Sequence, residues 1–569
     1  MKGRLAALLG AALLMGASLV RAAPLDVAWW KDGKLVALQL RDDGSSKTGA
    51  FDGERMVPLG SLWKLFVYVY AVDAKLPMTD YTCSGQQPQE EVYCCEPGKS
   101  VARDAALAQS CGLFYAPARL MVERRPWRQY WAERLGRAPA GDAEWLSDPA
   151  RLTPARLVTL RSLLAALASI PAASRVEAEA ALLRVVLGAR GVDTVGWFGS
   201  RLRVKTFSWH HEKRPAQRVG GAAGWLADGT PVWFSGAGTS SGVLRAWAPR
   251  LAAVLPAGAP ALDAGCVVVD FFKRYPIRHV FTVGSAGMAA TPGALNGHYH
   301  VRFENGRSLA LFSRGELVLA TDDKSRIVLS GRFGVNEYVA RVIDREGGTA
   351  QPEAAKALAV AARSYLQQNA VWAEGCQRIA DSSATQRVSP SPASAAARQV
   401  AQWTDQLVLS GATVRYHSNK ASKDTMAWSG AVEQAGQGRR FDEILALAWP
   451  HAELTTMVGG ASLQCERMSA AEAWLARALP RWERTLRHEP GYETPRQLPA
   501  VCRLAAGAPY SEQSRNRVFV RALATREDRI TLAHEFLHLG LRNHPHGLDE
   551  NLVEQLARRL VDIQLEARP

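Results

Sequence analysis

The run P-E-A-A-K-A-L-A-V-A-A-R-S-Y at residues 352–365 decides the fold of the middle of the chain. Alanine is the strongest helix former and proline is favoured at the first helical position, so the run predicts an alanine-rich helix that begins at Pro352. Three strand-like segments precede it, at residues 301–303, 308–312 and 316–321. Strands followed by a helix predict an α+β domain for this part of the chain.

The segment just upstream, G-V-N-E-Y-V-A-R-V-I at residues 334–343 followed by Arg345-Glu346, extends this pattern. The two runs in this order resemble the SpoIID/LytB family of peptidoglycan lytic transglycosylases, which have an E-D-Y-L-x-G-V-V-x-x-E-M segment followed by A-L-K-A-Q-A-V-A-A-R-T-Y. Residues 381–387 and 416–419 resemble later motifs of that family. The resemblance implies a SpoIID-like α+β domain that cleaves murein glycan.

The family's catalytic acid falls at Glu346. One carboxyl group suffices for lytic cleavage, because it protonates the glycosidic oxygen and then helps the sugar's own hydroxyl close a 1,6-anhydro ring. A glycosidase that adds water usually needs two carboxylates. Two positions depart from the family: Gly347 replaces methionine, and residues 420–424 replace a glycine-rich stretch. The alternative is therefore an altered site that binds glycan without cleaving it.

A second motif, H-E-F-L-H, occupies residues 534–538 near the C-terminus. On a helix, His534 and His538 project from the same face, so that both imidazoles reach one metal ion. Glu535 lies beside them and can accept a proton from metal-bound water, whose pKa zinc lowers towards ~7. The motif resembles that of the zincin metallopeptidases. We therefore expect Zn2+ as a cofactor in a mainly helical, zincin-like C-terminal region.

A catalytic zinc site needs a third protein ligand, which must come from farther along the chain. His544 is our prediction, because it lies ten residues after His534, the separation seen in metzincins. The glycine that metzincins place seven residues after the first histidine is absent, since Leu541 stands there. The alternatives that stay open are His546, Asp549, Glu550 and Glu554.

The N-terminal part carries an S-x-x-K motif at Ser61 and Lys64, which opens an apolar helix. One helical turn brings the lysine beside the serine, where a neutral amine can activate the hydroxyl. With Ser110 and Lys205, the order of motifs resembles that of penicillin-binding proteins and β-lactamases. The resemblance implies a transpeptidase/β-lactamase-like α/β domain with Ser61, Lys64, Ser110 and Lys205 as catalytic residues.

Two neighbours of these residues depart from that resemblance. Gly112 replaces the asparagine of the second motif, and Phe207 replaces the glycine of the third. A bulky ring at residue 207 should obstruct the approach of a substrate to the strand. We therefore expect the fold to be kept and the activity to be degenerate.

The first 22 residues read as a secretory signal. Lys2 and Arg4 precede an apolar run from Leu5 to Val20, and cleavage is expected after Ala22. The run is shorter than the ~20 residues that a spanning helix needs. We expect a periplasmic or secreted protein that is not integral to the membrane once the signal is removed.

The charge of the chain points to acidic partners. The formal net charge is +15, of which Lys2, Arg4 and Arg21 leave with the signal, so that +12 remains. In the envelope, anionic polymers are the natural partners of such a chain. We expect peptidoglycan or envelope proteins as partners, and no nucleic acid, since no nucleic-acid motif is present.

All eight cysteines lie in the mature chain, where an oxidising compartment permits disulfides. Four of them cluster between residues 83 and 111, and Cys465 with Cys502 forms a candidate C-terminal pair. The spacing leaves the remaining connectivity open. No paired C-x2-C arrangement occurs, which argues against a cysteine zinc site.

The whole layout predicts a multidomain α+β protein. We expect a signal at residues 1–22, a penicillin-binding/β-lactamase-like domain at 24–256, a SpoIID/LytB-like domain at 265–425 and a helical domain at 426–569. As a whole it resembles a YfaQ-like, DUF2300-type family of predicted secreted bacterial proteins. The expected function is peptidoglycan remodelling by a zinc hydrolase with a glycan-cleaving site. The alternatives are an inactive murein- or partner-binding protein and a zinc protease that acts on proteins only.

Overall fold

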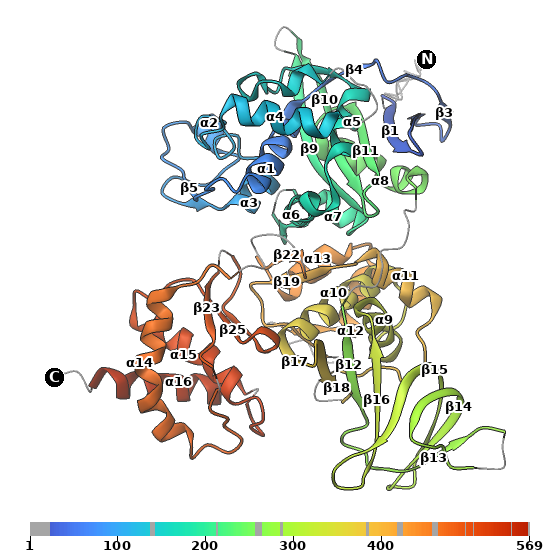
Figure 1. Ribbon diagram of the computed structural model, residues 1–569, viewed down its shortest axis with the longest axis vertical. Coiled ribbons are helices and arrows are strands. Elements are labelled where there is room, and N and C mark those ends of the chain that lie inside the picture. The colour runs from blue at the N-terminus through green and yellow to red at the C-terminus, as the bar shows by residue number, and fades with distance from the viewer. Residues whose placement is uncertain are drawn as a thin grey trace, which may run out of the picture.

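A computed structural model shows three groups of helices and strands, with the N-terminal group stacked above the other two (Figure 1). The expected signal peptide, most of the linker near residue 260 and residues 418–424 lie outside the described residues. The structure describes residues 23–136, 143–189, 191–211, 214–256, 265–284, 288–382, 386–417, 425–457, 465–495, 497–504, 506–547 and 549–566.

The N-terminal group is built on a six-stranded antiparallel sheet in the order β3-β2-β1-β11-β10-β9. Its strands are β1 (Leu25–Lys31), β2 (Lys34–Leu40), β3 (Ser46–Thr48), β9 (Leu202–His211), β10 (Arg214–Leu226) and β11 (Pro231–Ala237). Short pairs are formed by β4 (Met56–Pro58) with β7 (Leu157–Thr159) and by β5 (Tyr81–Thr82) with β6 (Ser100–Val101). The helices are α1 (Trp63–Asp73), α2 (Pro88–Glu91), α3 (Arg103–Gln109), α4 (Arg124–Leu135), α5 (Leu160–Ser169), α6 (Ala172–Leu183), α7 (Asp193–Phe198) and α8 (Ser240–Val254).

This sheet separates two apolar cores because alternate strand residues point to opposite faces. On one face, Phe207 and Trp233 pack with the apolar residues of α1 and α5. On the other face, Val204 and Phe234 pack with Trp247 of α8. The turn that leads into α1 contacts strand β9. Ser61 and Lys64 therefore lie beside that strand.

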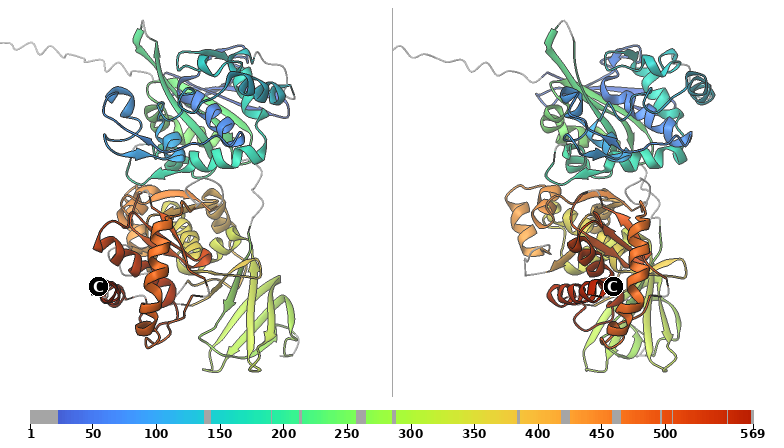
Figure 2. Two further views of the ribbon diagram at one scale, coloured as in Figure 1. Left: turned by 60° about the vertical axis from the view of Figure 1, so that its left-hand side comes forward. Right: turned by 90° about the vertical axis from the view of Figure 1, so that its left-hand side faces the viewer.

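The middle group is built on a seven-stranded sheet in the order β13-β14-β15-β16-β12-β18-β17, antiparallel except for β12 and β18. Its long strands β14 and β15 extend to the bottom of the molecule (Figure 2). The strands are β12 (Val267–Phe271), β13 (Ile277–Thr282), β14 (Gly293–Phe303), β15 (Ser308–Thr321), β16 (Ile327–Phe333), β17 (Val371–Ala373) and β18 (Cys376–Ala380). The helices are α9 (Val335–Glu346), α10 (Pro352–Asn369) and α11 (Ala395–Trp403).

Helix α10 is the predicted alanine-rich helix, and it begins at Pro352 as expected. Its small side chains let neighbours pack closely on several sides, and most of its residues are buried. Arg363, which is fully buried, donates from its guanidinium to the carbonyl oxygens of Ala401, Thr404 and Leu407 at 2.8–3.1 Å. The arginine of the A-V-A-A-R-S-Y run therefore anchors the chain that follows α11.

Residues 426–457, which we assigned to the C-terminal domain, pack in the core of the middle group with α10. A three-stranded sheet in the order β19-β22-β8 joins this core to the N-terminal group. Beside it, the buried Glu453 carboxylate accepts hydrogen bonds from the Arg184 guanidinium at 2.8–3.2 Å. The elements are β8 (Val185–Val186), β19 (Leu407–Ser410), β20 (Arg415–His417), β21 (Thr425–Ala427), α12 (Trp428–Gly436), α13 (Phe441–Ala448) and β22 (Glu453–Thr456).

The C-terminal group combines three helices with a small sheet in the order β23-β25-β24. Its elements are α14 (Ser469–Leu486), β23 (Ala500–Arg503), β24 (Tyr510–Glu512), β25 (Arg517–Val520), α15 (Arg526–Gly540) and α16 (Glu550–Glu566). Helix α15 begins with a capping box, in which Thr525 and Asp528 each accept from the other's backbone N–H. Phe536 and Leu537 of α15 pack with Leu560 of α16, so the two helices lie against each other.

All eight cysteines form disulfides, so none is free to bind metal. The predicted pair Cys465–Cys502 is confirmed, and the N-terminal cluster resolves into Cys83–Cys95 and Cys94–Cys111. Cys266–Cys376, which the sequence left open, links β12 to β18. The expected multidomain α+β class is confirmed by the mixture of sheets and helices in each group.

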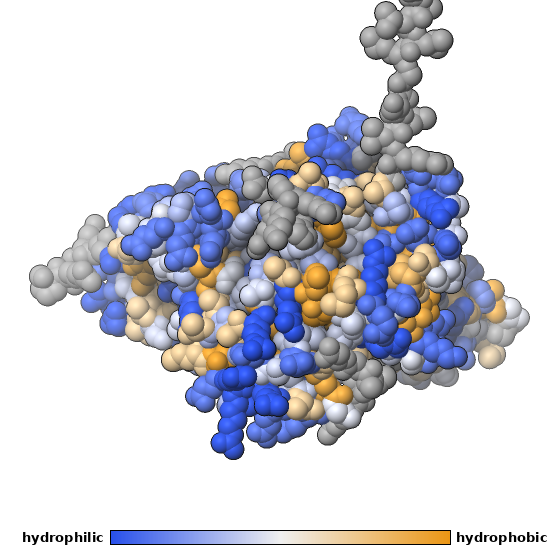
Figure 3. Space-filling view, turned by 90° about the horizontal axis from the view of Figure 1, so that it is seen from above, coloured by the Kyte–Doolittle hydropathy of each residue, from blue (hydrophilic) through white to orange (hydrophobic). Residues whose placement is uncertain are grey.

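No helix within the described residues has both the length and the apolar composition needed to cross a bilayer. Seen from above, hydrophilic side chains are interspersed with small apolar areas over the outer face of the N-terminal group (Figure 3). Scattered apolar residues of this kind are normal on water-exposed protein surfaces.

Candidate functional site

The structure brings the four predicted residues of the N-terminal domain into one cluster. The Lys64 ammonium donates to the Ser61 hydroxyl at 3.0 Å and to the Ser110 hydroxyl at 3.4 Å. Burial lowers the pKa of Lys64 to about 8. Burial and then the charge of Lys64 lower the pKa of Lys205 to about 7. A lowered pKa increases the share of neutral amine, which is the form that can take a proton from a serine.

Phe207 closes one side of this cluster, because its ring packs against the backbone of Gly60, next to the serine. Gly60 has a φ of +49°, and a Cβ there would lie 2.8 Å from the Cβ of Phe207. Phe207 itself is 1% exposed, and Lys64 and Lys205 are 6% and 2% exposed. The two lysines therefore lie inside a packed core, with the half-buried Ser61 and Ser110 at its edge.

Glu346 ends helix α9 and is held by the chain around it. Its Oε1 accepts from the backbone N–H of Arg387 at 2.6 Å, and the Tyr416 hydroxyl also donates to its carboxylate. Tyr416 in turn accepts from the side-chain amide of Gln386, whose oxygen accepts from Tyr338. Burial raises the pKa of Glu346 above its ordinary value, although the hydrogen bonds from Arg387 and Tyr416 oppose the rise. A carboxyl group with a raised pKa is suited to donate a proton near neutral pH.

The H-E-F-L-H residues lie on α15 and face α16, and Glu550 completes a cluster with both histidines. The Nε2 atoms of His534 and His538 lie 3.1 Å apart. Oε2 of Glu550 lies 3.0 Å from Nε2 of His534 and 3.6 Å from Nε2 of His538. Donor atoms held at about 2.0–2.2 Å from a tetrahedral zinc lie about 3.3–3.6 Å apart. The measured separations of 3.0, 3.1 and 3.6 Å lie within a few tenths of an ångström of that range, so the three atoms are close enough to bind one metal ion.

The surroundings of this cluster fit the same interpretation. Oε2 of Glu554 lies 3.0 Å from Nδ1 of His534, which is the carboxylate–histidine arrangement that orients a metal ligand. If Nδ1 carries the proton for Glu554, Nε2 presents a lone pair towards the Glu550 carboxylate, and a bound cation between these two acceptors would remove their repulsion. Glu535 is 6% exposed, and its Oε2 has no hydrogen-bond partner among the described residues.

His544 lies outside this cluster, although we expected it to be the third ligand. Helix α15 ends at Gly540, and the chain then turns, so the ten-residue spacing leads into a loop. There, Nδ1 of His544 accepts from the backbone N–H of His546 at 2.9 Å. Glu550, one of the alternatives, stands at the N-terminus of α16, where helix packing carries it to the histidines.

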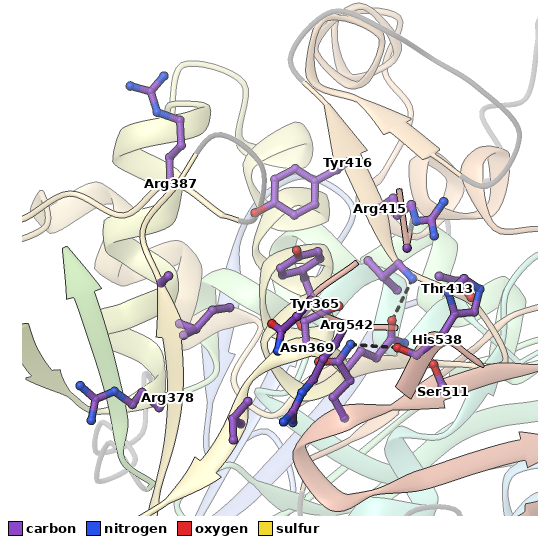
Figure 4. A pocket seen from close by; sticks show the side chains of 18 of the residues that line it. Tyr365, Asn369, Arg378, Arg387, Thr413, Arg415, Tyr416, Ser511, His538 and Arg542 are labelled. Carbon is purple, nitrogen blue, oxygen red and sulfur yellow. Dashed lines mark hydrogen bonds between the residues drawn. The ribbon is translucent and has the colours of Figure 1, made fainter. Parts of the chain in front are cut away.

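A cavity of about 1270 Å³, which we call the interdomain cleft, opens between the middle and C-terminal groups. Glu346 lines it from the middle group. Tyr416 of the same group and His538 of α15 also line it (Figure 4). Its other charged and polar lining residues are Asp270, Lys273, Arg274, Arg345, Tyr365, Gln368, Asn369, Arg378, Arg387, Thr413, Arg415, Ser511, Gln513, Arg542, Asn543 and His544. Ser61, Lys64, Ser110 and Lys205 do not line it.

Sequence reasoning did not identify Arg415 of this cleft, and it named Tyr416 only as part of the motif at residues 416–419. Arg415 donates to Oε1 of Glu550 at 2.6 Å, and its neighbour Tyr416 donates to Glu346. Glu554, one of the open alternatives for the third ligand, lies outside the ligand cluster and 3.0 Å from Nδ1 of His534. No local pattern indicated that β20 would approach α16.

Two family models match the chain. A model described as "Predicted secreted protein (DUF2300)" matches residues 86–216 and 424–546. A model described as "Stage II sporulation protein" (SpoIID) matches residues 323–434, which include Glu346 and α10. Among curated proteins, "Uncharacterized protein YfaQ" of Escherichia coli (strain K12) is 45% identical over 523 residues, which cover 92% of this chain and 93% of that protein.

Solved structures of β-lactamases show a likeness to part of the chain. The class D enzyme YbXI from Nostoc is 13% identical, with a TM-score of 0.27, over 41% of this chain and 94% of that one. An ancestral class A β-lactamase is 15% identical, with a TM-score of 0.25, over 41% of this chain and 94% of that one.

Proposed function

The chain belongs to the DUF2300 family of predicted secreted proteins, and from that premise we propose that it is a cell-wall-processing enzyme with a zinc-dependent hydrolytic centre. The description of the family as secreted agrees with the signal peptide expected at residues 1–22. The SpoIID match supports a role at the cell wall. The observation that carries the proposal is the cluster of His534, His538 and Glu550, whose three ligand atoms lie 3.0–3.6 Å apart.

Each residue of the centre has a role in this proposal. His534, His538 and Glu550 hold the metal, and Glu554 fixes the ring of His534 in the binding tautomer. When bound, zinc lowers the pKa of a water molecule to about 7 and polarises a carbonyl group. Glu535 would accept the proton of that water, because its Oε2 has no hydrogen-bond partner among the described residues.

Metal analysis of the purified protein tests the centre. We expect about one zinc ion per chain, because three protein ligands with one open position make a catalytic zinc site. His534→Ala and Glu550→Ala should each lose the metal. His544→Ala is the matched control, since this histidine lies nearby but outside the cluster, and it should keep the metal. A wild-type protein without zinc, or loss of zinc in His544→Ala alone, contradicts the proposal.

A second candidate function is glycan cleavage at Glu346, in line with the SpoIID match. It is favoured by the burial that raises the pKa of this carboxyl group at the wall of a cleft. In this proposal Glu346 protonates the glycosidic oxygen and then serves as the base for ring closure.

Digestion of murein sacculi tests this second function. Wild-type protein should release anhydro-muropeptides and Glu346→Gln should not. The exposed Glu304, in the turn between β14 and β15, supplies the control Glu304→Gln, which should release them at the wild-type rate. If wild type releases no product and binds no zinc, the chain is instead a protein that binds murein or a partner without chemistry.

A further inference from the structure

The proposed metal ligand Glu550 stands at an exposed position. It is the first residue of α16, and its side chain is open to solvent. A long side chain in such a place has several rotamers available. Its Oε2 atom nevertheless faces the Nε2 atoms of His534 and His538. A metal site binds tightly when its ligands are held in the binding geometry by further contacts, so the residue that holds Glu550 matters.

Arg415, which belongs to the middle group, contacts the other oxygen of this carboxylate. Its Nη2 atom lies 2.6 Å from Oε1 of Glu550. Arg415 and its neighbour Tyr416 point in different directions from β20 (Figure 4). Tyr416 can therefore donate to Glu346 while Arg415 reaches the start of α16. Hydrogen bonds to a carboxylate that binds metal orient it, and here one oxygen is held by the arginine while the other faces the histidines.

The segment that carries Arg415 is fixed against the C-terminal group. Four residues earlier, the carbonyl oxygen of Gly411 accepts from the backbone N–H of Ala508 at 2.6 Å. The two backbones approach so closely that a Cβ on Gly411 would lie 2.2 Å from a backbone oxygen of the C-terminal group. On α10, the buried side-chain amide of Gln367 donates to the buried carboxylate of Glu512 at 2.8 Å. These contacts hold the two groups together, so that Arg415 is presented to Glu550.

The ion pair between Arg415 and Glu550 is too exposed to be a main support of the fold. The two side chains are 30% and 50% exposed, and exposed ion pairs contribute little net stability. Another arginine of the cleft, Arg378, forms a similar pair with Asp270. What distinguishes Arg415 is its partner, because Glu550 is one of the three residues of the candidate metal cluster.

We infer that Arg415 is a positioning residue of the metal centre, which is therefore assembled by two domains. The C-terminal group supplies the ligands His534, His538 and Glu550, and the middle group fixes the direction of Glu550. This rests on the proposed function, which includes the metal site. Metal binding then restrains β20 through Glu550 and Arg415, so it strengthens the contact between the middle and C-terminal groups.

The zinc affinity of full-length variants, measured by competition with a chromogenic chelator, tests the inference. Arg415→Ala should bind zinc about 10–100-fold more weakly than the wild type, the usual effect of removing a group that orients a metal ligand. Arg415→Lys should recover most of this loss, because one nitrogen makes the closest contact with Glu550. Arg378→Ala is the matched control, since Arg378 lines the same cleft and pairs with a carboxylate outside the metal cluster, and it should bind zinc like the wild type.

Hydrogen exchange distinguishes positioning from a general loss of stability. In the wild type, zinc should slow the exchange of backbone amides in both α15 and β20. In Arg415→Ala at saturating zinc, the exchange of α15 should still slow, whereas that of β20 should not. Without zinc, both proteins should unfold at nearly the same denaturant concentration, because the lost ion pair is exposed.

The outcomes separate the inference from the proposed function. Wild-type zinc affinity in Arg415→Ala overturns the inference, and so does an equal loss in Arg378→Ala, which would assign the effect to the general charge of the cleft. Weaker binding of sacculi by Arg415→Ala with unchanged zinc affinity also overturns it, because the arginine then contacts the substrate. If zinc binding depends on Arg415 but sacculi yield no metal-dependent product, the proposed function fails alone. A wild-type protein that binds no zinc overturns both.

Discussion

The Ser61–Lys64 cluster of the N-terminal domain and the interdomain cleft both contain residue types that are used in catalysis. They differ in the space that surrounds these residues. In the first, Lys64 bonds to both serines, and Phe207 packs beside them in the core. In the second, Glu346 and His538 line a large cavity. Glu535, which follows His534 on the same helix as His538, has no partner for its Oε2 among the described residues. An assembled set of catalytic residue types is therefore insufficient evidence of activity, since a site also needs space and unsatisfied groups for a ligand.

The largest effect that distinguishes these regions is expected at Glu535. Glu535→Gln removes the proposed proton acceptor, so metal-dependent release of products from sacculi should fall about 10²–10⁴-fold. The zinc content should not change, because Glu535 is outside the ligand cluster. Glu527→Gln, in the exposed first turn of the same helix, serves as the control. A Glu535→Gln protein with wild-type activity would contradict the role of Glu535 as the proton acceptor of the proposed zinc centre.

The next largest effect is expected at the ion pair between the N-terminal and middle groups, which joins Arg184 and Glu453. Glu453→Gln leaves the buried Arg184 without its carboxylate, which should lower the free energy of unfolding by about 3–5 kcal/mol. Chemical denaturation measures this change. Replacing both residues by Met should cost less than the single change, since no uncompensated charge is left. A single change with no effect on stability would show that the N-terminal domain folds without this contact.

A smaller effect is expected in the pH dependence of glycan cleavage. Burial raises the pKa of Glu346, and the hydrogen bond from Tyr416 opposes that rise. A general acid acts while it is protonated, so the rate should be full below this pKa and fall as the pH rises through it. Tyr416→Phe removes the opposing hydrogen bond, raises the pKa further and should shift the fall in kcat/KM to higher pH. Tyr93→Phe, at an exposed tyrosine of the N-terminal domain, should leave the profile unchanged.

The parts of these sites that the sequence predicted are those set by local geometry. Ser61 with Lys64 and His534 with His538 are three and four residues apart on helices, so their proximity follows from helix geometry alone. The start of α10 at Pro352 also follows from local preferences.

The parts that were missed depend on how distant segments pack. Glu550 reaches the histidines only because α16 packs on α15, and Arg415 reaches Glu550 only because the middle and C-terminal groups meet. The pairing of β8 with β22 likewise joins segments more than 250 residues apart, as the 269-residue separation of Arg184 and Glu453 shows. Spacing within one segment contains no information about such contacts.

The smallest effect is expected at Ser61, and it tests whether the N-terminal cluster is inactive. Ser61→Ala removes one acceptor of the buried Lys64 amine, which should cost about 0.5–1.5 kcal/mol of stability. Because Ser61 does not line the cleft, the release of products from sacculi should stay at the wild-type rate. A fluorescent penicillin measures access directly, and the packing of Phe207 against Gly60 should keep labelling of the wild type low. Rapid labelling that Ser61→Ala abolishes, together with slower sacculus digestion, would make the N-terminal cluster an active site despite its packing.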